Sequence, residues 1–251
     1  MRKKIVAGNW KMNKTITEAT ALVVDLVNYQ SDFPKEVQVI IAPPALYLAG
    51  FELMDNDCIH LAAQNCSDKD SGAYTGEISA SMLHSMNVNF CLIGHSERRQ
   101  YFEESNDTIK GKIDACLRHG ISPIFCCGET LPEREANTHF VTVLHQVESA
   151  LWHLSPEQLS KVIIAYEPVW AIGTGLTATT AQAQEMHAFI RESLANHFGQ
   201  DSANAISILY GGSVNALNSQ ELFSQPDVDG GLVGGASLKA KDFAAIVNSA
   251  G

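Results

Sequence analysis

The chain has 251 residues, of which 45% are hydrophobic and 18% are charged, and its formal net charge is −11. This length allows one large domain or two small ones, which fold without a disulfide or metal staple. The composition excludes a disordered chain and a coiled coil. The negative charge argues against binding to nucleic acid or to an anionic membrane, so an anionic substrate would need local cations and backbone amides.

The N-terminus and the cysteines indicate the compartment. The basic start Met1-Arg2-Lys3-Lys4 precedes an apolar run that is too short for a secretion signal, and no stretch approaches the roughly 18 apolar residues of a membrane span. The six cysteines include no C-x-x-C pair. We expect a cytoplasmic protein with no structural metal and with reduced thiols, including the adjacent Cys126 and Cys127.

Eight short apolar runs recur along the chain at an average spacing of about 32 residues. Near-continuous apolar character over about five residues is typical of parallel strands that are buried on both faces. The predicted strands are residues 5–10, 37–42, 59–64, 90–94, 123–127, 162–166, 206–210 and 231–233.

Helical patterns lie between these runs. Thr15 and Thr179 each begin a capping box. Ser105 and Ser237 stand where they can cap two further helices, and Gly120 is placed as a C-terminal stop. The apolar positions that mark the predicted helices include Leu22, Leu26, Ile109, Ile113, Val141, Leu144, Leu151, Met186, Ile190, Phe243, Ile246 and Val247.

Eight strand–helix units without a linker fit either a closed barrel or an open doubly wound sheet. A dinucleotide-binding sheet would need G-x-G-x-x-G after a strand, and Gly173-Thr174-Gly175 lacks the third glycine. Eight units in this length favour a closed (β/α)8 TIM barrel in the α/β class, with residues 1–251 as a single domain.

In a barrel the chemistry gathers at the C-terminal ends of the strands, and Lys11, His95 and Glu167 stand at three such ends. Lys11 would hold an anion over the barrel mouth. Ser96 can cap a short helix that begins beside His95. The dipole of this helix would lower the pKa of the His95 imidazole and keep the ring neutral. Glu167 follows a buried strand directly, which is costly unless the carboxylate is paired or acts as a general base.

Two other carboxylates, Glu97 and Glu129, also follow strands, and Arg98, Arg99 and other loop cations could pair with them. Residues 168–175 form an apolar loop that we interpret as an exposed lid beside the base.

Glycine pairs follow the seventh and eighth strands, where Gly211-Gly212-Ser213 and Gly234-Gly235 would let backbone amides approach a phosphate.

Several longer stretches match one known family. They are Gly8-Asn9-Trp10-Lys11-Met12-Asn13, Ala63-Gln64-Asn65, Gly72-Ala73-Tyr74-Thr75-Gly76-Glu77, Ile93-Gly94-His95-Ser96-Glu97-Arg98-Arg99, Tyr166-Glu167-Pro168-Val169-Trp170-Ala171-Ile172-Gly173-Thr174-Gly175, Tyr210-Gly211-Gly212-Ser213 and Val233-Gly234-Gly235-Ala236-Ser237. The sequence resembles the triosephosphate isomerase family over its whole length.

The resemblance implies an aldose–ketose isomerase that interconverts dihydroxyacetone phosphate and glyceraldehyde 3-phosphate in glycolysis and gluconeogenesis, through an enediol(ate). It implies that Glu167 moves the carbon-bound proton, and that neutral His95 polarises the carbonyl and shuttles protons between the two enediolate oxygens. Asn9 and Lys11 would hold the substrate, with Glu97 as a supporting residue near Lys11 and His95. The lid would be residues 168–178. Phosphate would be held by the backbone at Gly173, Ser213, Gly234 and Gly235. No metal or organic cofactor is implied.

The resemblance also implies a homodimer in which the loop around Thr75 reaches toward Asn9 and His95 of the other copy. Two positions depart from the family pattern: Leu176 replaces a lysine in the lid, and Thr180 replaces a proline at the next helix start. Because proline at a first helical position limits unfolded freedom, we expect a looser hinge and a less heat-stable protein, which Thr180→Pro would reverse.

Two other functions compete with this one. The first is a different phosphate-binding barrel enzyme, such as an aldolase or a biosynthetic isomerase. A Schiff-base aldolase would need a lysine at the end of a middle strand, where this chain has Glu167. A non-enzymatic binding or scaffold protein is also compatible with the fold, since fold alone does not fix function. Loss of activity should damage the lysine, histidine or glutamate, and all three are present.

Overall fold

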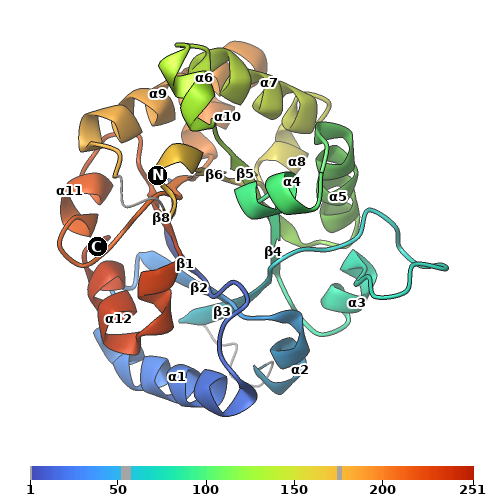
Figure 1. Cartoon of the computed structure of the whole chain (residues 1–251), viewed down its shortest axis with the longest axis vertical. Coiled ribbons are helices and arrows are strands. Elements are labelled where there is room, and N and C mark those ends of the chain that lie inside the picture. Colours follow the sequence, from blue (N-terminus) through green and yellow to red (C-terminus); the bar gives the residue numbers. More distant parts are fainter. Residues whose placement is uncertain (1, 52–57, 174–176) are drawn as a thin grey trace.

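The chain forms a closed barrel of eight parallel strands in the order β1 to β8, in which β8 pairs with β1 (Figure 1). The computed structural model describes residues 2–51, 58–173 and 177–251. Each of the eight predicted runs contains a strand, so the predicted barrel is confirmed. The strands are β1 (Lys4–Asn9), β2 (Val37–Ala42), β3 (Ile59–Ala63), β4 (Phe90–Ile93), β5 (Ser122–Cys127), β6 (Ile163–Tyr166), β7 (Ile208–Tyr210) and β8 (Gly230–Val233).

Helices surround the barrel on the outside (Figure 1). The longer ones pack an apolar face onto the strands, and the short ones lie in the loops. They are α1 (Ile16–Tyr29), α2 (Leu48–Phe51), α3 (Ala80–His84), α4 (Ser96–Tyr101), α5 (Asn106–Arg118), α6 (Leu131–Glu135), α7 (His139–Leu151), α8 (Pro156–Leu159), α9 (Thr180–Phe198), α10 (Gln200–Ala205), α11 (Ser219–Phe223) and α12 (Ala240–Asn248), with 3-10 turns at Gln30–Asp32, Ala45–Tyr47, Val169–Ala171 and Gly235–Leu238.

Three of the predicted helix starts are confirmed in atomic detail. Thr15 and Thr179 are the N-caps of α1 and α9, each within a capping box. Ser105 caps α5, and Gly120 follows that helix with a φ of 73°. A positive φ is where glycine costs least, which explains why the helix stops there.

Two helical expectations are wrong. Ser237 does not cap the last helix, because its hydroxyl donates to the Gly234 carbonyl at 2.7 Å inside a 3-10 turn, and α12 starts only after Lys239. Val141 is 70% exposed, whereas Val143 and Val147 form the buried face of α7. The spacing of apolar residues in α7 therefore indicated a helix but not which of its faces is buried.

The core has two layers, one inside the barrel and one between strands and helices. Neighbouring residues of a strand point into different layers, so Cys126 lies in the interior and Cys127 in the outer layer. Both are free thiols, as expected. Burial raises the pKa of both, that of Cys127 to about 12. They are therefore unreactive thiols.

No helix in the described part of the chain is long and apolar enough to cross a bilayer.

The start of α9 has a contact that proline could not make. The Thr180 hydroxyl donates to Oε1 of Glu221 on α11 at 2.8 Å. The sequence-based expectation considered only what the chain loses without proline at this position. The other departure from the family, Leu176, lies outside the described residues.

We expect Thr180→Pro alone to change the free energy of unfolding little. A gain of about 0.4–1 kcal/mol from reduced unfolded freedom is offset by the loss of a hydrogen bond worth about 0.5–1.5 kcal/mol. In a Glu221→Ala background the hydrogen bond is already absent, so the same substitution should stabilise. Urea unfolding of the four proteins in this cycle measures both effects. Equal effects in both backgrounds would show that the Thr180–Glu221 contact contributes nothing, and no stabilisation in either would reject the hinge hypothesis.

Candidate active site

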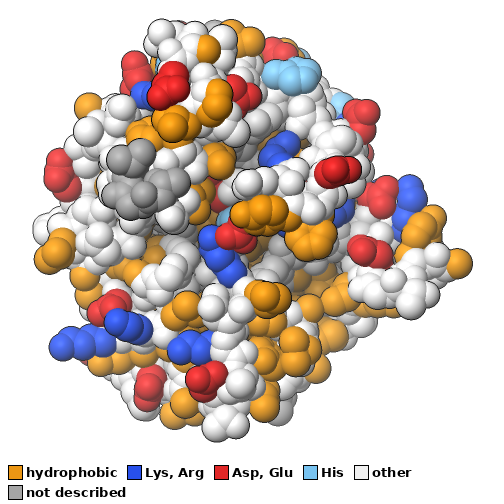
Figure 2. All heavy atoms as spheres, viewed as in Figure 1, with side chains coloured by type: hydrophobic (Ala, Val, Ile, Leu, Met, Phe, Trp, Pro, Cys, Tyr) orange, Lys and Arg blue, Asp and Glu red, His pale blue; other side chains and the backbone are white. Residues whose placement is uncertain are grey.

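A cavity of about 800 Å³ opens at the C-terminal end of the barrel. Figure 2 shows this face, where basic and acidic side chains meet beside a central hollow. Because parallel strands end at the same side of a closed barrel, groups far apart in sequence converge there. All of the predicted site residues line the cavity: Asn9, Lys11, His95, Glu97, Glu167, Gly173, Ser213, Gly234 and Gly235.

Lys11 is held in an unusual backbone conformation. Its φ is 52°, in the left-handed region that non-glycine residues rarely occupy. The Asn9 side-chain oxygen accepts from the Lys11 amide at 3.0 Å, and the Lys11 carbonyl accepts from Gln64 at 2.9 Å. These contacts fix the lysine at the barrel mouth, where its ammonium lies 2.5 Å from Oε1 of Glu97.

Glu97 is therefore paired with a different cation from the arginines beside it. Arg98 binds Glu104 instead, and Arg99 donates to backbone carbonyls near the ends of β4 and β5. Of the cations that could have paired with Glu97, Arg98 and Arg99 do not, because their guanidinium groups bind other acceptors. Glu97, which follows β4, pairs instead with Lys11, which follows β1. The position of Glu97 beside Lys11 and His95 is the one that the family resemblance implied.

The start of α4 differs from the prediction in a way that matters for the site. His95, not Ser96, is the N-cap: its Nδ1 accepts from the Glu97 amide at 3.2 Å. A nitrogen that accepts carries no proton, so in this arrangement the ring donates through Nε2. Ser96 does not cap the helix; its backbone amide and its hydroxyl donate to Glu167 instead.

Glu167 is a fully buried carboxylate with several donors. One oxygen accepts from the Ser96 amide at 2.8 Å, and the other lies 3.3 Å from the Ser96 hydroxyl and 3.0 Å from Nε2 of His95. Burial alone raises the pKa of Glu167. The His95 ring and the Ser96 amide together lower it below its usual range, so the carboxylate stays ionised.

His95 has the opposite balance. Burial lowers the pKa of its ring, but the adjacent Glu167 carboxylate raises it, and the net direction is upward. The expectation that a helix terminus would lower this pKa is therefore wrong for the arrangement seen here, because the contact with Glu167 is closer and stronger. Whether the His95 ring is neutral therefore depends on the position of the Glu167 carboxylate.

Two glycines make room for Glu167, a role that was not foreseen from the sequence. A Cβ on Gly128 would lie 1.7 Å from the Glu167 carbonyl oxygen, and one on Gly211 would lie 2.9 Å from the Glu167 Cγ. Either overlap would force the backbone or the Glu167 side chain to move. The glycine pair after β7 had been interpreted only as a phosphate-binding feature, and its packing role has no sequence pattern of its own.

The apolar loop after Glu167 is less exposed than predicted. Val169, Trp170 and Ile172 are half-buried, and the Trp170 indole donates to Oε1 of Glu129 at 2.7 Å. Glu129 is fully buried, also accepts from Tyr166, and lies 3.6 Å from Arg134. The first part of the predicted lid is thus anchored to the barrel, and residues 174–176 of that lid lie outside the described residues.

The predicted phosphate-binding residues face open space. Nothing lies within 4 Å of a Cβ built on Gly173 or Gly235, and only the Lys11 Cε approaches one built on Gly234. Ser213 is exposed at the cavity rim. Among the described residues, this part of the cavity therefore combines exposed backbone with the nearby Lys11 ammonium.

Thr75 lies elsewhere. It stands in the exposed part, residues 69–77, of the loop between β3 and α3, which projects away from the barrel in Figure 1. The structure does not bring this residue to the cavity of its own chain.

A closed barrel with a lysine, a histidine and a buried ionised glutamate at its mouth defines a class: barrel enzymes that move a proton next to a carbonyl of an anionic substrate. A family model described as triosephosphate isomerase matches residues 4–250. The chain belongs to the triosephosphate isomerase family, and it is an enzyme that isomerises triose phosphates, a step of glycolysis. The aldolase and scaffold hypotheses are therefore wrong.

Relatives of the same name are similar over almost their whole length. The triosephosphate isomerase of Cytophaga hutchinsonii is 52% identical over 250 residues, which cover 99% of this chain and 100% of the relative. The one from Porphyromonas gingivalis is 53% identical with the same coverage. The one from Bacteroides fragilis is 51% identical over 99% of both chains.

We expect removal of the Glu167 charge to lower the pKa of His95. In the parent protein burial lowers this pKa, and the Glu167 carboxylate raises it above its ordinary value. In Glu167→Gln that main raising cause is lost, and burial and the Lys11 charge are opposed only by the Glu97 carboxylate. NMR titration of the histidine ring protons measures the shift, with the other histidines as internal controls. An unchanged His95 titration in the variant would show that Glu167 does not control this ring.

Proposed function

We propose that Glu167 is the general base of the isomerisation and that it carries the proton between the two neighbouring carbons. The observation that carries this proposal is the Glu167 carboxylate, which is buried beside His95, is held ionised, and lines the same cavity as Lys11. The interconversion of dihydroxyacetone phosphate and glyceraldehyde 3-phosphate needs one base that removes a proton next to the carbonyl. The C–H electron pair then forms the enediol(ate) double bond, and the carbonyl oxygen takes up the negative charge.

The oxygen that gains charge would lie against His95 and Lys11. The Nε2–H of His95 donates a hydrogen bond to it, and the Lys11 ammonium supplies a positive charge nearby. The hydroxyl proton on the neighbouring carbon passes to this charged oxygen, and the neutral His95 ring would carry it between the two oxygens. When Glu167 returns its proton to the other carbon, the pair of the enediolate double bond forms the new C–H bond, and the oxygen that lost its proton forms the isomeric carbonyl. Glu167 ends the cycle ionised and His95 ends it neutral, so no cofactor or metal is required.

The state of His95 follows the position of Glu167. While the Glu167 carboxylate contacts the ring, it raises the pKa of His95. Once this carboxylate turns to the substrate carbon, burial and the Lys11 charge lower that pKa, and only the Glu97 carboxylate still raises it. The amide of Glu97, which donates to Nδ1, also favours the unprotonated ring. A neutral His95 would therefore arise when substrate engages the base.

The remaining residues would position the substrate. Backbone groups at Gly173, Ser213, Gly234 and Gly235 would hold the phosphate, supported by their open surroundings at the cavity. Asn9 would set the Lys11 backbone, and Glu97 would direct the Lys11 ammonium through its ion pair. The loop of residues 168–178 would close over the site and keep water from the enediolate, which in water can lose its phosphate.

We propose a homodimer built around the projecting loop of Thr75. Exposed apolar side chains on the same side of the chain support it, and Figure 2 shows hydrophobic atoms at the surface over α2. A surface of this kind is costly in a monomer. The exposed residues are Met12, Leu46, Tyr74, Met82 and Phe102. Sedimentation velocity separates the two states, and a monomer at micromolar concentration would reject the proposal.

We also propose that residues 1–251 act as a single domain in the cytoplasm. The closed barrel uses strands from both ends of the chain, since β1 pairs with β8. The six cysteines are free, which is typical of proteins in a reducing compartment. Localisation of a tagged full-length chain tests the second part, and secretion of the protein would contradict it.

We expect Glu167→Gln to lower kcat for glyceraldehyde 3-phosphate by about 10²–10⁴-fold, the range of a lost general base. A coupled dehydrogenase assay on the purified protein measures the rate. Glu157→Gln is the matched control, because Glu157 is an exposed glutamate of α8 outside the cavity and should keep the parent rate. Parent-like turnover by Glu167→Gln would reject Glu167 as the base.

A further inference from the structure

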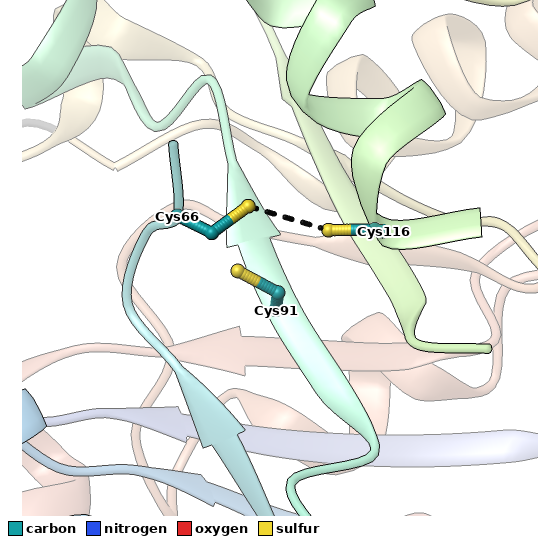
Figure 3. A group of neighbouring side chains, drawn as sticks. All are labelled: Cys66, Cys91 and Cys116. Atoms are coloured by element: carbon teal, nitrogen blue, oxygen red, sulfur yellow. Dashed lines mark hydrogen bonds between the residues drawn. The ribbon is translucent and has the colours of Figure 1, made fainter. Parts of the chain in front are cut away.

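Three cysteines from separate elements meet in the core, away from the cavity. Cys66 follows β3, Cys91 lies on β4, and Cys116 lies on α5, and Figure 3 shows their sulfur atoms turned toward one another. The Sγ atoms of Cys66 and Cys116 are 3.5 Å apart, and all three lie within 4.8 Å of one another. Each residue is at most 1% exposed. The spacing of 25 residues between neighbours forms no recognisable motif, so only the fold reveals the cluster.

The separations fit a single ion at the centre of the three sulfurs. A metal–sulfur bond of about 2.3 Å in a flat three-sulfur site places the sulfurs about 4 Å apart. The observed distances are compatible with this value, since one pair is at 3.5 Å and none exceeds 4.8 Å.

A buried cation stands beside the cluster. Lys112 is 5% exposed; its ammonium donates to Oδ1 of Asn65, the residue before Cys66, at 2.8 Å, and it forms an ion pair with the buried Glu104. Lys112 lies on α5, the helix that carries Cys116, so this contact holds the segment of Cys66 against that helix.

We propose that Cys66, Cys91 and Cys116 form a binding site for one Cu(I) ion. Three soft sulfur ligands suit Cu(I), whereas structural Zn²⁺ sites are almost always four-coordinate. Within the described residues no fourth cysteine, histidine or carboxylate joins the group, and burial leaves no access for water as a ligand. Binding is coordination without redox change: the ion takes electron pairs from the three sulfurs, and each thiol that becomes a thiolate releases one proton to solvent.

An ion at this position would connect three parts of the chain. Cys66 lies at the base of the loop that carries Thr75, and this base is closed by a bridge between Ser67 and Ser79. Cys91 lies on the strand that leads to His95. A ligand that binds only the folded chain raises its stability by RT ln(1 + L/Kd), where L is the free ligand concentration. Cu(I) would therefore stabilise the loop base against the barrel.

The test titrates the full-length, reduced protein with Cu(I) under anaerobic conditions, against a competing Cu(I) chelator of known affinity. It is repeated on Cys66→Ser, Cys91→Ser and Cys116→Ser, and on Cys58→Ser as the matched control, since Cys58 is exposed and outside the cluster. Melting temperature and isomerase turnover are measured with and without copper, so that each variant is shown to be folded. X-ray absorption of the copper-loaded parent counts sulfur neighbours without any substitution.

We expect one Cu(I) per chain, a higher melting temperature on loading, and three sulfur neighbours. Affinity should fall at least tenfold in each cluster variant and stay unchanged in Cys58→Ser. Equal copper binding by parent and cluster variants would overturn the proposal, as would two sulfur neighbours or equally tight binding of Zn²⁺. A Cys66–Cys116 disulfide formed on copper addition, seen as the loss of two hydrogens by mass, would also overturn it.

Discussion

The buried, ionised carboxylate of Glu167 is the constraint on which the site depends. A charge at the end of a buried strand is costly unless donors surround it. The Ser96 amide and hydroxyl and the His95 ring supply those donors. The start of α4 must therefore lie against β6, and glycine is required at positions 128 and 211, where any larger residue would meet Glu167. The geometry that stabilises the Glu167 carboxylate also keeps it beside the His95 ring.

A chain with a net charge of −11 binds a phosphorylated substrate through local arrangement rather than through its overall charge. Lys11 is fixed in a left-handed conformation by Asn9 and directed by Glu97. Because Arg98 and Arg99 are engaged elsewhere, this lysine supplies the positive charge at the described part of the cavity rim. The positive charge and the open glycine backbone thus lie together where an anion would bind.

Much of this structure could be predicted from sequence, for identifiable physical reasons. Strands buried on both faces leave continuous apolar runs, and capping boxes mark helix starts, so the barrel and the caps at Thr15 and Thr179 were predictable. Motifs at strand ends located the cavity residues. The partner choices were not predictable from the residues alone, because they depend on distances between segments. Only the family resemblance implied that Glu97 lies near Lys11, and nothing indicated that His95 takes the capping position assigned to Ser96. The pKa of His95 was misjudged for the same reason, since its close contact with Glu167 outweighs the helix terminus.

The most direct test of the account is isomerisation of glyceraldehyde 3-phosphate in D₂O, followed by NMR of the product. If Glu167 carries the proton as a carboxylic acid, part of that proton exchanges with solvent before it returns to carbon. The account predicts deuterium on the carbon next to the product carbonyl, and loss of both exchange and turnover in Glu167→Gln. A product free of deuterium at every stage of the reaction would indicate direct hydride transfer between the carbons and would contradict the account.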